Sequence, residues 1–292
     1  MQRKEQIAEM NRTVMKKMSV FLNYEPNFVK REMMEELTRE CALSEEEAFA
    51  YILAATVGLD HEKDPLAREI FTSYFPRMIH ALDTREFLSD PYLQTVRLPD
   101  KKLGSWDFLT ERYEPYEAFA CDDLILDGEG AVFPQIGFFR ETYTYPAVRE
   151  NGREWMSLNP NEIRTMRAPI AKAHGRVLTY GLGLGYFAFM ASRKAEVSSV
   201  MVVERDRNAI RLFEEEIRPQ LPTRGKIAVV CADAFEYAAH DMKAGNYDFV
   251  FADIWHDPSD GVEAYLRFKM TEHLSPRSEF AYWIEPTLRY YL

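Results

Sequence analysis

The sequence predicts an α/β fold with a mostly parallel sheet, shortened at its C-terminal end, that follows a helical region and a small β region. Two observations lead to this prediction. In residues 160–292, short apolar runs alternate with amphipathic helical runs, which is the pattern of strand–helix–strand units. These apolar runs contain few polar residues, as strands covered by helices on both faces require. We therefore divide the chain into residues 1–85, 86–155 and 156–292.

Residues 1–85 are expected to form a helical domain. Near the N-terminus, apolar residues recur at helical spacing: Ile7, Met10, Val14 and Met18. Ser44–Glu47 is a capping-box pattern that precedes a second apolar stripe. The helical pattern continues to Pro76, and Met78–Leu82 is expected to add one more helical turn. This domain either packs as a helical module or covers a ligand site, and the sequence leaves both interpretations open.

Residues 86–155 are expected to form the small β region that connects the two larger parts. Helical periodicity fades here, and aromatic residues appear in short extended pieces. Asp127-Gly128-Glu129-Gly130 lies between two apolar runs and predicts a hairpin, and Asn151-Gly152 predicts another. The aromatic residues are expected to pack within half-buried strands.

Residues 156–292 are expected to contain the parallel sheet. Pro160 begins a helix that ends before Gly175. Five strands are then expected, at Arg176–Tyr180, Ser198–Glu204, Lys226–Cys231, Tyr247–Asp253 and Phe280–Ile284. Each connection between them contains a helical run, so right-handed crossovers are expected.

The first of these strands ends in a glycine-rich turn that is typical of nucleotide sites. Gly181, Gly183 and Gly185 occupy alternate positions between the strand and an apolar helix. Glycine permits a sharp turn and a close approach of the ligand to the backbone. The N–H groups at the start of the helix then face an anionic or polar group.

Acidic residues follow the next strands at the same edge of the sheet. Ligands of open parallel sheets bind beyond the carboxyl ends of the strands. Glu204 can accept hydrogen bonds from both hydroxyls of a ribose, and Asp233 can accept one from the amine of adenine. Asp233 is also suited to cap the helix that begins at Ala234. Asp253 ends the fourth strand.

Four segments together resemble the motifs of class I S-adenosylmethionine-dependent methyltransferases, which have a Rossmann-like sheet. They are VLTYGLGLG, VVERD, CADAFEY and YDFVFADIW. The resemblance implies a methyltransferase that uses S-adenosyl-L-methionine. The implied cofactor-binding residues are Gly181, Leu182, Gly183, Gly185, Glu204, Arg205, Asp233, Ala234 and Asp253. The implied substrate-binding residues are Trp255, His256 and Asp257, with His256 and Asp253 as the catalytic candidates.

The chain departs from the family's pattern at two places. The family usually has an acidic residue two positions before the first glycine, and Thr179 stands there. Few residues follow Asp253, so we expect the sheet to have fewer strands than the family's. Its exposed edge can be covered by residues 86–155 or by a second copy of the chain in a homodimer, and we expect residues 86–155 to cover it.

Three alternative functions remain open from the sequence. A spermidine synthase-type aminopropyltransferase would carry a D-x-x-D-P motif, and Asp253–Pro258 is one residue longer than that motif. A nicotinamide-dinucleotide-binding protein would use Gly183, Gly185 and Ala188 as its G-x-G-x-x-A motif and Glu204 as the acid that binds the ribose. A third possibility is a nucleoside-binding sensor or scaffold without catalysis.

Composition and net charge limit the expected binding partners and the expected cellular location. The chain has 292 residues and a formal net charge of −11, which makes nucleic acid a less favoured acceptor than a small molecule or a protein. Its three cysteines lie outside any CxxC pattern and its six histidines form no HxxxH pair, so neither disulfides nor a metal are expected. There is no apolar signal segment or membrane span, and we expect a cytoplasmic protein.

Overall fold

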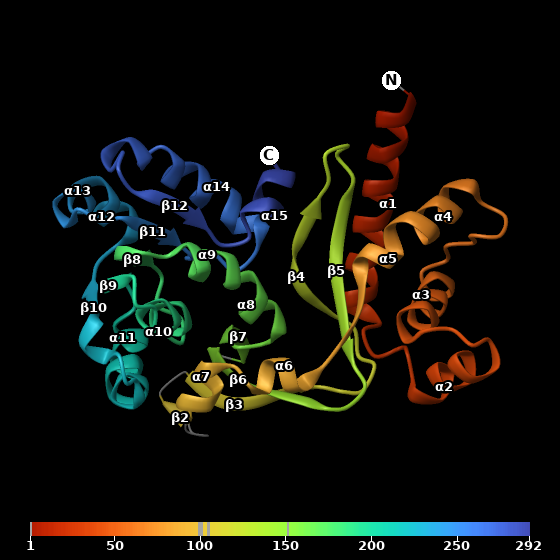
Figure 1. Ribbon diagram of the computed structural model, residues 1–292, viewed down its shortest axis with the longest axis horizontal. Helices are drawn as coiled ribbons and strands as arrows, with labels where there is room; N and C mark the ends of the chain where they lie inside the picture. Colours follow the sequence, from red (N-terminus) through yellow and green to blue (C-terminus); the bar gives the residue numbers. More distant parts are fainter. Residues whose placement is uncertain (1, 99–101, 104–105, 151) are drawn as a thin grey trace. The chain divides into compact units, whose positions relative to one another are not determined.

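The computed structural model describes residues 2–98, 102–103, 106–150 and 152–292 (Figure 1). The chain separates into two compact units. The first comprises the described residues up to Phe87 together with Glu111–Tyr145, and the second comprises Leu88–Thr110 and Pro146–Leu292. Helices of residues 1–85 thus share a unit with strands from the predicted β region.

The first unit is mainly helical at its N-terminal end, as expected. Its helices are α1 (Gln2–Tyr24), α2 (Arg31–Glu40), α3 (Glu45–Thr56), α4 (Pro65–Glu69), a π-helical turn (Ile70–Tyr74), α5 (Phe75–Met78) and α6 (Thr84–Leu88). The predicted capping box is confirmed at the start of α3. The Ser44 hydroxyl accepts a hydrogen bond from the Glu47 amide at 3.2 Å, and the Glu47 carboxylate accepts one from the Ser44 amide at 2.8 Å.

The first unit also contains a three-stranded sheet. Its order is β1-β5-β4, with β1 at Ile79–Leu82, β4 at Phe119–Leu126 and β5 at Val132–Phe139. The helical turn predicted at Met78–Leu82 is wrong, because β1 pairs in parallel with β5 and tertiary pairing overrides the local pattern. The hairpin at Asp127 is confirmed, since the Asp127 amide donates to the Ala131 carbonyl at 3.0 Å.

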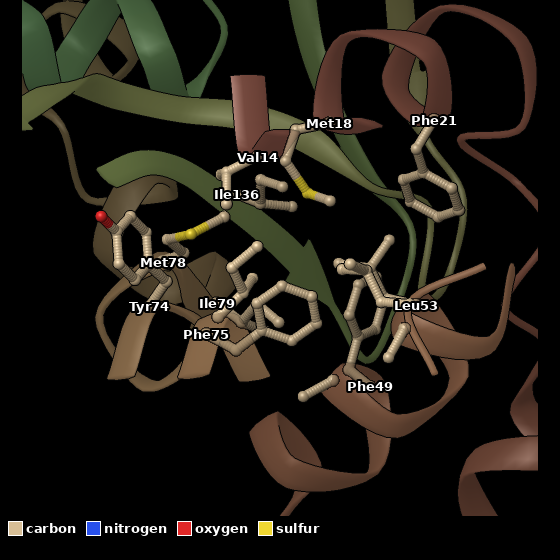
Figure 2. Packing of buried hydrophobic residues seen from close by; sticks show 14 of the residues in the cluster. Val14, Met18, Phe21, Phe49, Leu53, Tyr74, Phe75, Met78, Ile79 and Ile136 are labelled. Carbon is tan, nitrogen blue, oxygen red and sulfur yellow. The ribbon is translucent and has the colours of Figure 1, made fainter. Parts of the chain in front are cut away.

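The apolar stripe of α1 forms part of the core of the first unit. Figure 2 shows Val14 and Met18 packed with residues of α3, α5, β1 and β5. The rings of Phe49 and Phe138 stack with their centroids 4.4 Å apart. Burial of this stripe explains why the N-terminal pattern has helical spacing.

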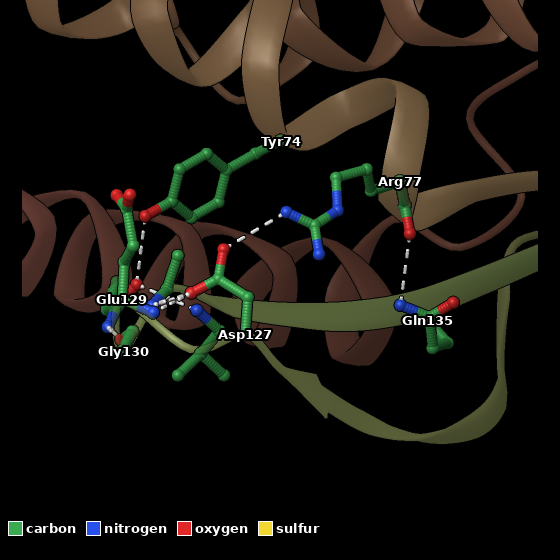
Figure 3. Close-up of polar contacts among 9 residues, drawn as sticks. Tyr74, Arg77, Asp127, Glu129, Gly130 and Gln135 are labelled. Carbon is green, nitrogen blue, oxygen red and sulfur yellow. Dashed lines mark hydrogen bonds and ion pairs between the residues drawn. The ribbon is translucent and has the colours of Figure 1, made fainter.

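A polar cluster anchors the β4–β5 turn within the first unit (Figure 3). Asn11 is buried, and its amide oxygen accepts hydrogen bonds from the Val132 amide and the Tyr74 hydroxyl, both at 3.0 Å. Its amide nitrogen donates to the Gly130 carbonyl at 2.8 Å. All the polar atoms of this buried side chain therefore serve the turn.

A second small sheet has the order β2-β3-β6-β7. Its strands are β2 (Lys102–Leu103), β3 (Trp106–Tyr113), β6 (Tyr143–Glu150) and β7 (Arg153–Ser157). β6 and β7 pair in antiparallel fashion, as the second hairpin signal predicts. Gly152 in that turn has φ +81°, and Asn151 lies outside the described residues.

The second unit contains a five-stranded, fully parallel sheet, which confirms the predicted Rossmann-like fold class. Its strands are β8 (Gly175–Tyr180), β9 (Val197–Glu204), β10 (Ile227–Cys231), β11 (Phe249–Ala252) and β12 (Glu279–Tyr282). Their order is β10-β9-β8-β11-β12. From β8 the chain adds β9 and β10 on one side, and it then adds β11 and β12 on the other side. A ligand-binding crevice forms where the strand order changes direction in this way, between β8 and β11.

Helices connect the strands of the parallel sheet. They are α10 (Tyr186–Ser192), α11 (Arg207–Leu212), α12 (Ala234–His240), α13 (Met242–Gly245), α14 (Pro258–Lys269) and α15 (Glu285–Tyr290), and α7 (Pro91–Thr95), α8 (Pro160–Thr165) and α9 (Arg167–Lys172) precede the sheet. α10 and α11 both pack on β9 and β10. No helix in the described ranges is both long and apolar enough to span a lipid bilayer.

The expectation that residues 86–155 cover the edge of the parallel sheet is wrong for the described part of the chain. None of its described strands joins β10 or β12, the two edge strands. They pair instead in the two smaller sheets. β4 and β5 are joined by a short turn, and such local pairing forms at a low entropy cost.

Candidate functional site

The glycine-rich turn after β8 uses its glycines for different purposes. Gly181 has φ +96°, and a Cβ there would lie 1.9 Å from the Asp253 carbonyl oxygen. Gly185 has φ +75°, and a Cβ there would lie 2.5 Å from the Phe213 ring. Gly183 has φ +51°, and a Cβ there would meet no atom within 4 Å. Gly181 and Gly185 thus permit close packing, whereas Gly183 faces open space.

Hydrogen bonds of two tyrosines connect the turn, and the helix α10 that follows it, to α7 and its N-cap. The hydroxyl of the buried Tyr92 donates to the Leu184 carbonyl at 2.5 Å. The hydroxyl of Tyr186 donates to the carboxylate of Asp90 at 2.9 Å. The turn is therefore held by the residues around it.

A cavity of about 600 Å³ opens at the carboxyl ends of the parallel strands. It is lined by residues that follow β8, β9, β10 and β11, and also by β7 and α8. The predicted site residues that line it are Gly181, Leu182, Gly183, Glu204, Arg205, Asp233, Ala234, Asp253, Trp255 and His256. Gly185 and Asp257 do not line it. A volume of this size is typical of a small-molecule site.

Glu204 connects the end of β9 to the glycine-rich turn. One carboxylate oxygen accepts a hydrogen bond from the Leu182 amide at 3.1 Å, and the other accepts one from the Asp206 amide at 2.8 Å. A carboxylate oxygen has two lone pairs, so each retains one for a ligand. Glu204 therefore orders the turn and still offers acceptors to the cavity.

Asp233 is the N-cap of α12. Its Oδ1 accepts hydrogen bonds from the amides of Phe235 and Glu236, at 2.9 and 3.1 Å. Its Oδ2 has no hydrogen-bond partner among the described residues, and the side chain lines the cavity. The cap and the ligand-facing acceptor predicted from the sequence are compatible at this residue.

Two carboxyl groups from segments far apart in the sequence line the cavity. Asp253 follows β11, and Glu162 lies in the first turn of α8. Both residues are half-buried. Burial raises the pKa of Asp253 to about 7. Burial, and then the charge of Asp253, raises the pKa of Glu162 well above its usual value.

The loop after Asp253 places an aromatic side chain and a histidine at the cavity. Trp255 is 5% exposed, and its indole N–H has no hydrogen-bond partner in the described part of the chain. The Nδ1 of His256 lies 2.9 Å from the carboxylate of Asp260, and the imidazole contacts the Trp155 ring edge-on.

Asp260 fixes the orientation of His256. Its carboxylate also accepts hydrogen bonds from the amides of His256 and Asp257. Burial raises the pKa of Asp260, but the hydrogen bonds outweigh burial and the net shift is downward. An ionised carboxylate can only accept, so Nδ1 carries a proton and Nε2 of a neutral ring is the acceptor.

Asp257 has a structural position at the start of α14. It caps the helix by accepting a hydrogen bond from the Ser259 amide at 2.7 Å, with Asp260 completing a capping box. The sequence analysis missed Asp260 as the partner of His256, although its i,i+4 spacing and the capping-box pattern were both visible.

Sequence reasoning also missed the wall of the cavity that comes from β7 and α8. This wall consists of residues 154–158, Glu162 and Met166. Glu162 carried no motif, and only its three-residue spacing from the N-cap Asn159 was visible in the sequence. Thr179, where the resemblance calls for an acid, is buried and lines the cavity.

No family model matches the chain, and no curated protein matches it. Solved structures are similar to parts of it. A conserved hypothetical protein from Streptococcus pyogenes has 20% identity over 34% of this chain and 60% of its own, with a TM-score of 0.28. A proposed S-adenosylmethionine-dependent methyltransferase from Streptococcus mutans has 14% identity over 44% of this chain and 36% of its own, with a TM-score of 0.34.

Spermidine synthase from Thermotoga maritima has 13% identity over 45% of this chain and 55% of its own, with a TM-score of 0.30. This chain therefore spans between 36% and 60% of the length of these three structures. All three likenesses are partial, and each has a TM-score below 0.5.

Proposed function

We propose that this chain is an S-adenosylmethionine-dependent methyltransferase that acts on a small-molecule or protein acceptor. One observation carries the proposal: the ends of four neighbouring parallel strands deliver Gly183, Glu204, Asp233 and Asp253 to one cavity. Its volume of about 600 Å³ has room for a nucleoside cofactor beside an acceptor group.

The residues present fit the adenosyl part of this cofactor. Gly183 leaves open space for the ligand to approach the backbone. Glu204 retains acceptor capacity for the two ribose hydroxyls, and Asp233 Oδ2 is suited to the adenine amine.

The cofactor supplies an electrophilic methyl group on a sulfonium, so the protein's main task is alignment. Two side chains at the cavity are suited to remove a proton from the acceptor. His256 presents Nε2 as the acceptor because Asp260 holds Nδ1. Asp253, with a pKa of about 7, is partly ionised near neutral pH and can also take a proton.

Binding of defined nucleotides tests the proposal. We expect S-adenosylmethionine to bind in calorimetry and to raise thermal stability, by about 2.7 kcal/mol at a concentration of 100 times Kd. Decarboxylated S-adenosylmethionine is tested in parallel as the cofactor of an aminopropyltransferase, and NAD as the cofactor of a dehydrogenase. Tight binding of NAD alone would overturn the proposal, and binding without methyl transfer to any of a panel of amines, thiols, hydroxyls and protein extracts would favour the sensor interpretation.

A matched pair of variants assigns the binding to this cavity. Gly183→Ala places a methyl group in the open space of the cavity. Gly58→Ala is the control, since Gly58 has φ +65°, also meets no atom within 4 Å and belongs to the other unit. Both variants impose a similar backbone strain, of about 1 kcal/mol. We expect only Gly183→Ala to weaken S-adenosylmethionine binding, and an equal effect of the two would place the ligand elsewhere.

A further inference from the structure

A short segment at the start of the second unit is attached at both of its ends. This segment, residues 90–97, contains α7, and we call it the strap. At one end, the carboxylate of the buried Asp90 accepts a hydrogen bond from the Tyr186 hydroxyl at 2.9 Å. At the other end, the Arg97 amide donates to the Gln220 side chain at 2.9 Å, and that side chain donates to the Arg97 carbonyl at 3.0 Å. The strap is therefore fixed to segments that follow β8 and β9.

Tyr92 lies in the strap, and its hydroxyl bonds a buried carbonyl of the glycine-rich turn. The hydroxyl donates to the Leu184 carbonyl at 2.5 Å, and the two residues are 1% and 4% exposed. This carbonyl accepts no other hydrogen bond from the described residues. Buried carbonyls in proteins almost always have a donor. The strap thus supplies the donor that the main chain of the turn does not supply.

The ring of Tyr92 fixes the position of this hydroxyl. Its centroid lies 5.6 Å from that of Tyr186 and 6.0 Å from that of Phe189, and both contacts are edge-on. Edge-on pairs are a favourable arrangement of aromatic rings. Tyr186 and Phe189 belong to α10, the helix that begins directly after the turn. The hydroxyl is therefore held beside the turn by packing as well as by its hydrogen bond.

One peptide group of the turn is held at both of its polar ends. Its carbonyl, that of Leu184, bonds the Tyr92 hydroxyl, and its amide, that of Gly185, donates to the Leu182 carbonyl at 2.8 Å. Because a peptide group is planar, the two bonds together fix its orientation. Gly185 has φ +75°, and a glycine has access to many other backbone conformations. Without the Tyr92 hydroxyl, a single bond would oppose rotation of this peptide.

The order of the turn matters for a ligand because two of its amides are available for binding. The amides of Gly183 and Leu184 donate to no acceptor among the described residues, and both residues line the cavity. Backbone N–H groups are strong donors, so a bound molecule can accept hydrogen bonds from them. A site that is ordered before binding has the higher affinity, because binding then carries no ordering cost.

We propose that Tyr92 is a positioning residue, whose hydroxyl keeps the glycine-rich turn in one conformation and thereby raises the affinity of the cavity for an adenosyl ligand. The identity of this ligand rests on the proposed function, whereas the ordering of the turn does not. Tyr92 itself does not line the cavity, so its effect on binding passes through the turn.

The test compares Tyr92→Phe with Tyr265→Phe. Both variants keep the ring and remove one buried hydroxyl of the second unit, so both are expected to fold. Tyr265 is a matched control because it is 4% exposed and its hydroxyl donates to Glu285 at 2.8 Å. Neither Tyr265 nor Glu285 lines the cavity.

Amide hydrogen exchange measured by NMR reports the order of the turn without any ligand. In Tyr92→Phe, we expect exchange of the Gly185 amide to accelerate about threefold to tenfold relative to the amides of β9. A general loss of stability would accelerate the exchange of both to the same extent. Equal acceleration is therefore the result expected for Tyr265→Phe.

Calorimetry with S-adenosylhomocysteine measures the consequence for binding. We expect Tyr92→Phe to weaken binding about threefold to tenfold, because part of the binding free energy is then spent on ordering the turn. Tyr265→Phe should leave the affinity unchanged.

Two outcomes would overturn the role of Tyr92. One is equal acceleration of the Gly185 amide and the β9 amides in Tyr92→Phe, and the other is an unchanged affinity for S-adenosylhomocysteine in a variant whose turn exchanges faster. Failure of the proposed function gives a different result. If the unaltered protein binds neither S-adenosylmethionine nor S-adenosylhomocysteine, the methyltransferase proposal fails, and the exchange measurement still decides whether Tyr92 orders the turn.

Discussion

Replacement of Asp253 by asparagine should stabilise the second unit, and the gain should grow as the pH rises. The pKa of Asp253 is raised from 3.8 to about 7 by burial. The folded protein therefore holds this proton more tightly than the unfolded chain, so ionisation lowers its stability as the pH rises from about 4 to 7. Asparagine has nearly the same shape and does not ionise, which removes this penalty.

The size of the effect follows from the two pKa values. At 1.36 kcal/mol per pKa unit, the full difference corresponds to about 4 kcal/mol above pH 7. Between pH 5 and pH 8 the advantage of Asp253→Asn should increase by about 2–3 kcal/mol. Asp253 is only half-buried, which reduces these values, so we regard an increase of about 1 kcal/mol as the smallest result that agrees with the structure.

Urea unfolding followed by tryptophan fluorescence is the appropriate assay, because all four tryptophans of the chain lie in the second unit. The difference in unfolding free energy between the variant and the unaltered protein is measured from pH 5 to pH 8. Glu196→Gln is the control, since the pKa of Glu196 is lowered by backbone hydrogen bonds and by Lys194, which does not titrate in this range, so its difference should stay flat. A difference for Asp253→Asn that is equally flat would refute the reasoning.

Three further predictions concern single contacts. Gly181 has φ +96°, and a Cβ there would lie 1.9 Å from a carbonyl oxygen, so Gly181→Ala should destabilise the second unit by several kcal/mol. Gly183→Ala should lower stability by only about 1 kcal/mol. Equal losses in urea unfolding would contradict the packing role of Gly181 and the open surroundings of Gly183. Glu204→Gln keeps one acceptor oxygen and should weaken nucleoside binding by roughly 1.5–3 kcal/mol in calorimetry, and unchanged affinity would exclude the ribose contact. Asn11→Ala leaves the Val132 amide and the Tyr74 hydroxyl buried without an acceptor, and it should lower the unfolding free energy of the first unit by about 2–4 kcal/mol. Thermal unfolding followed by circular dichroism measures this loss, and Asn23→Ala, at an exposed position, is the control that should change little.

The acidic residues of the cavity differ in how the protein compensates their charge. Glu204 and Asp233 are already bonded to backbone amides, which compensate their charge. Glu162 and Asp253 lack such compensation among the described residues, and their pKa values are raised. The first pair is therefore suited to accept hydrogen bonds from neutral hydroxyl and amine donors.

The sequence by itself determined the parallel sheet and most of its rim. Apolar strands and helical stripes are local patterns, and the carboxyl ends of parallel strands meet at one edge, so Gly183, Glu204, Asp233 and Asp253 could be grouped before any coordinates. The capping box at Ser44 and the hairpin at Asp127 could also be predicted, because both depend on residues that are close together in the sequence.

Only the tertiary structure decided which residues meet across long separations. Strand β1 exists because β5 pairs with it, although the local pattern of residues 78–82 favours a helical turn. Gly181 and Gly183 cannot be distinguished in the sequence. In the structure, Gly181 packs against the Asp253 carbonyl, whereas Gly183 has no atom within 4 Å of the place where a Cβ would be. Glu162 and Asp253 lie in one cavity because α8 precedes the sheet and folds against its rim. Desolvation and charge repulsion depend on distances in space, which no local pattern encodes.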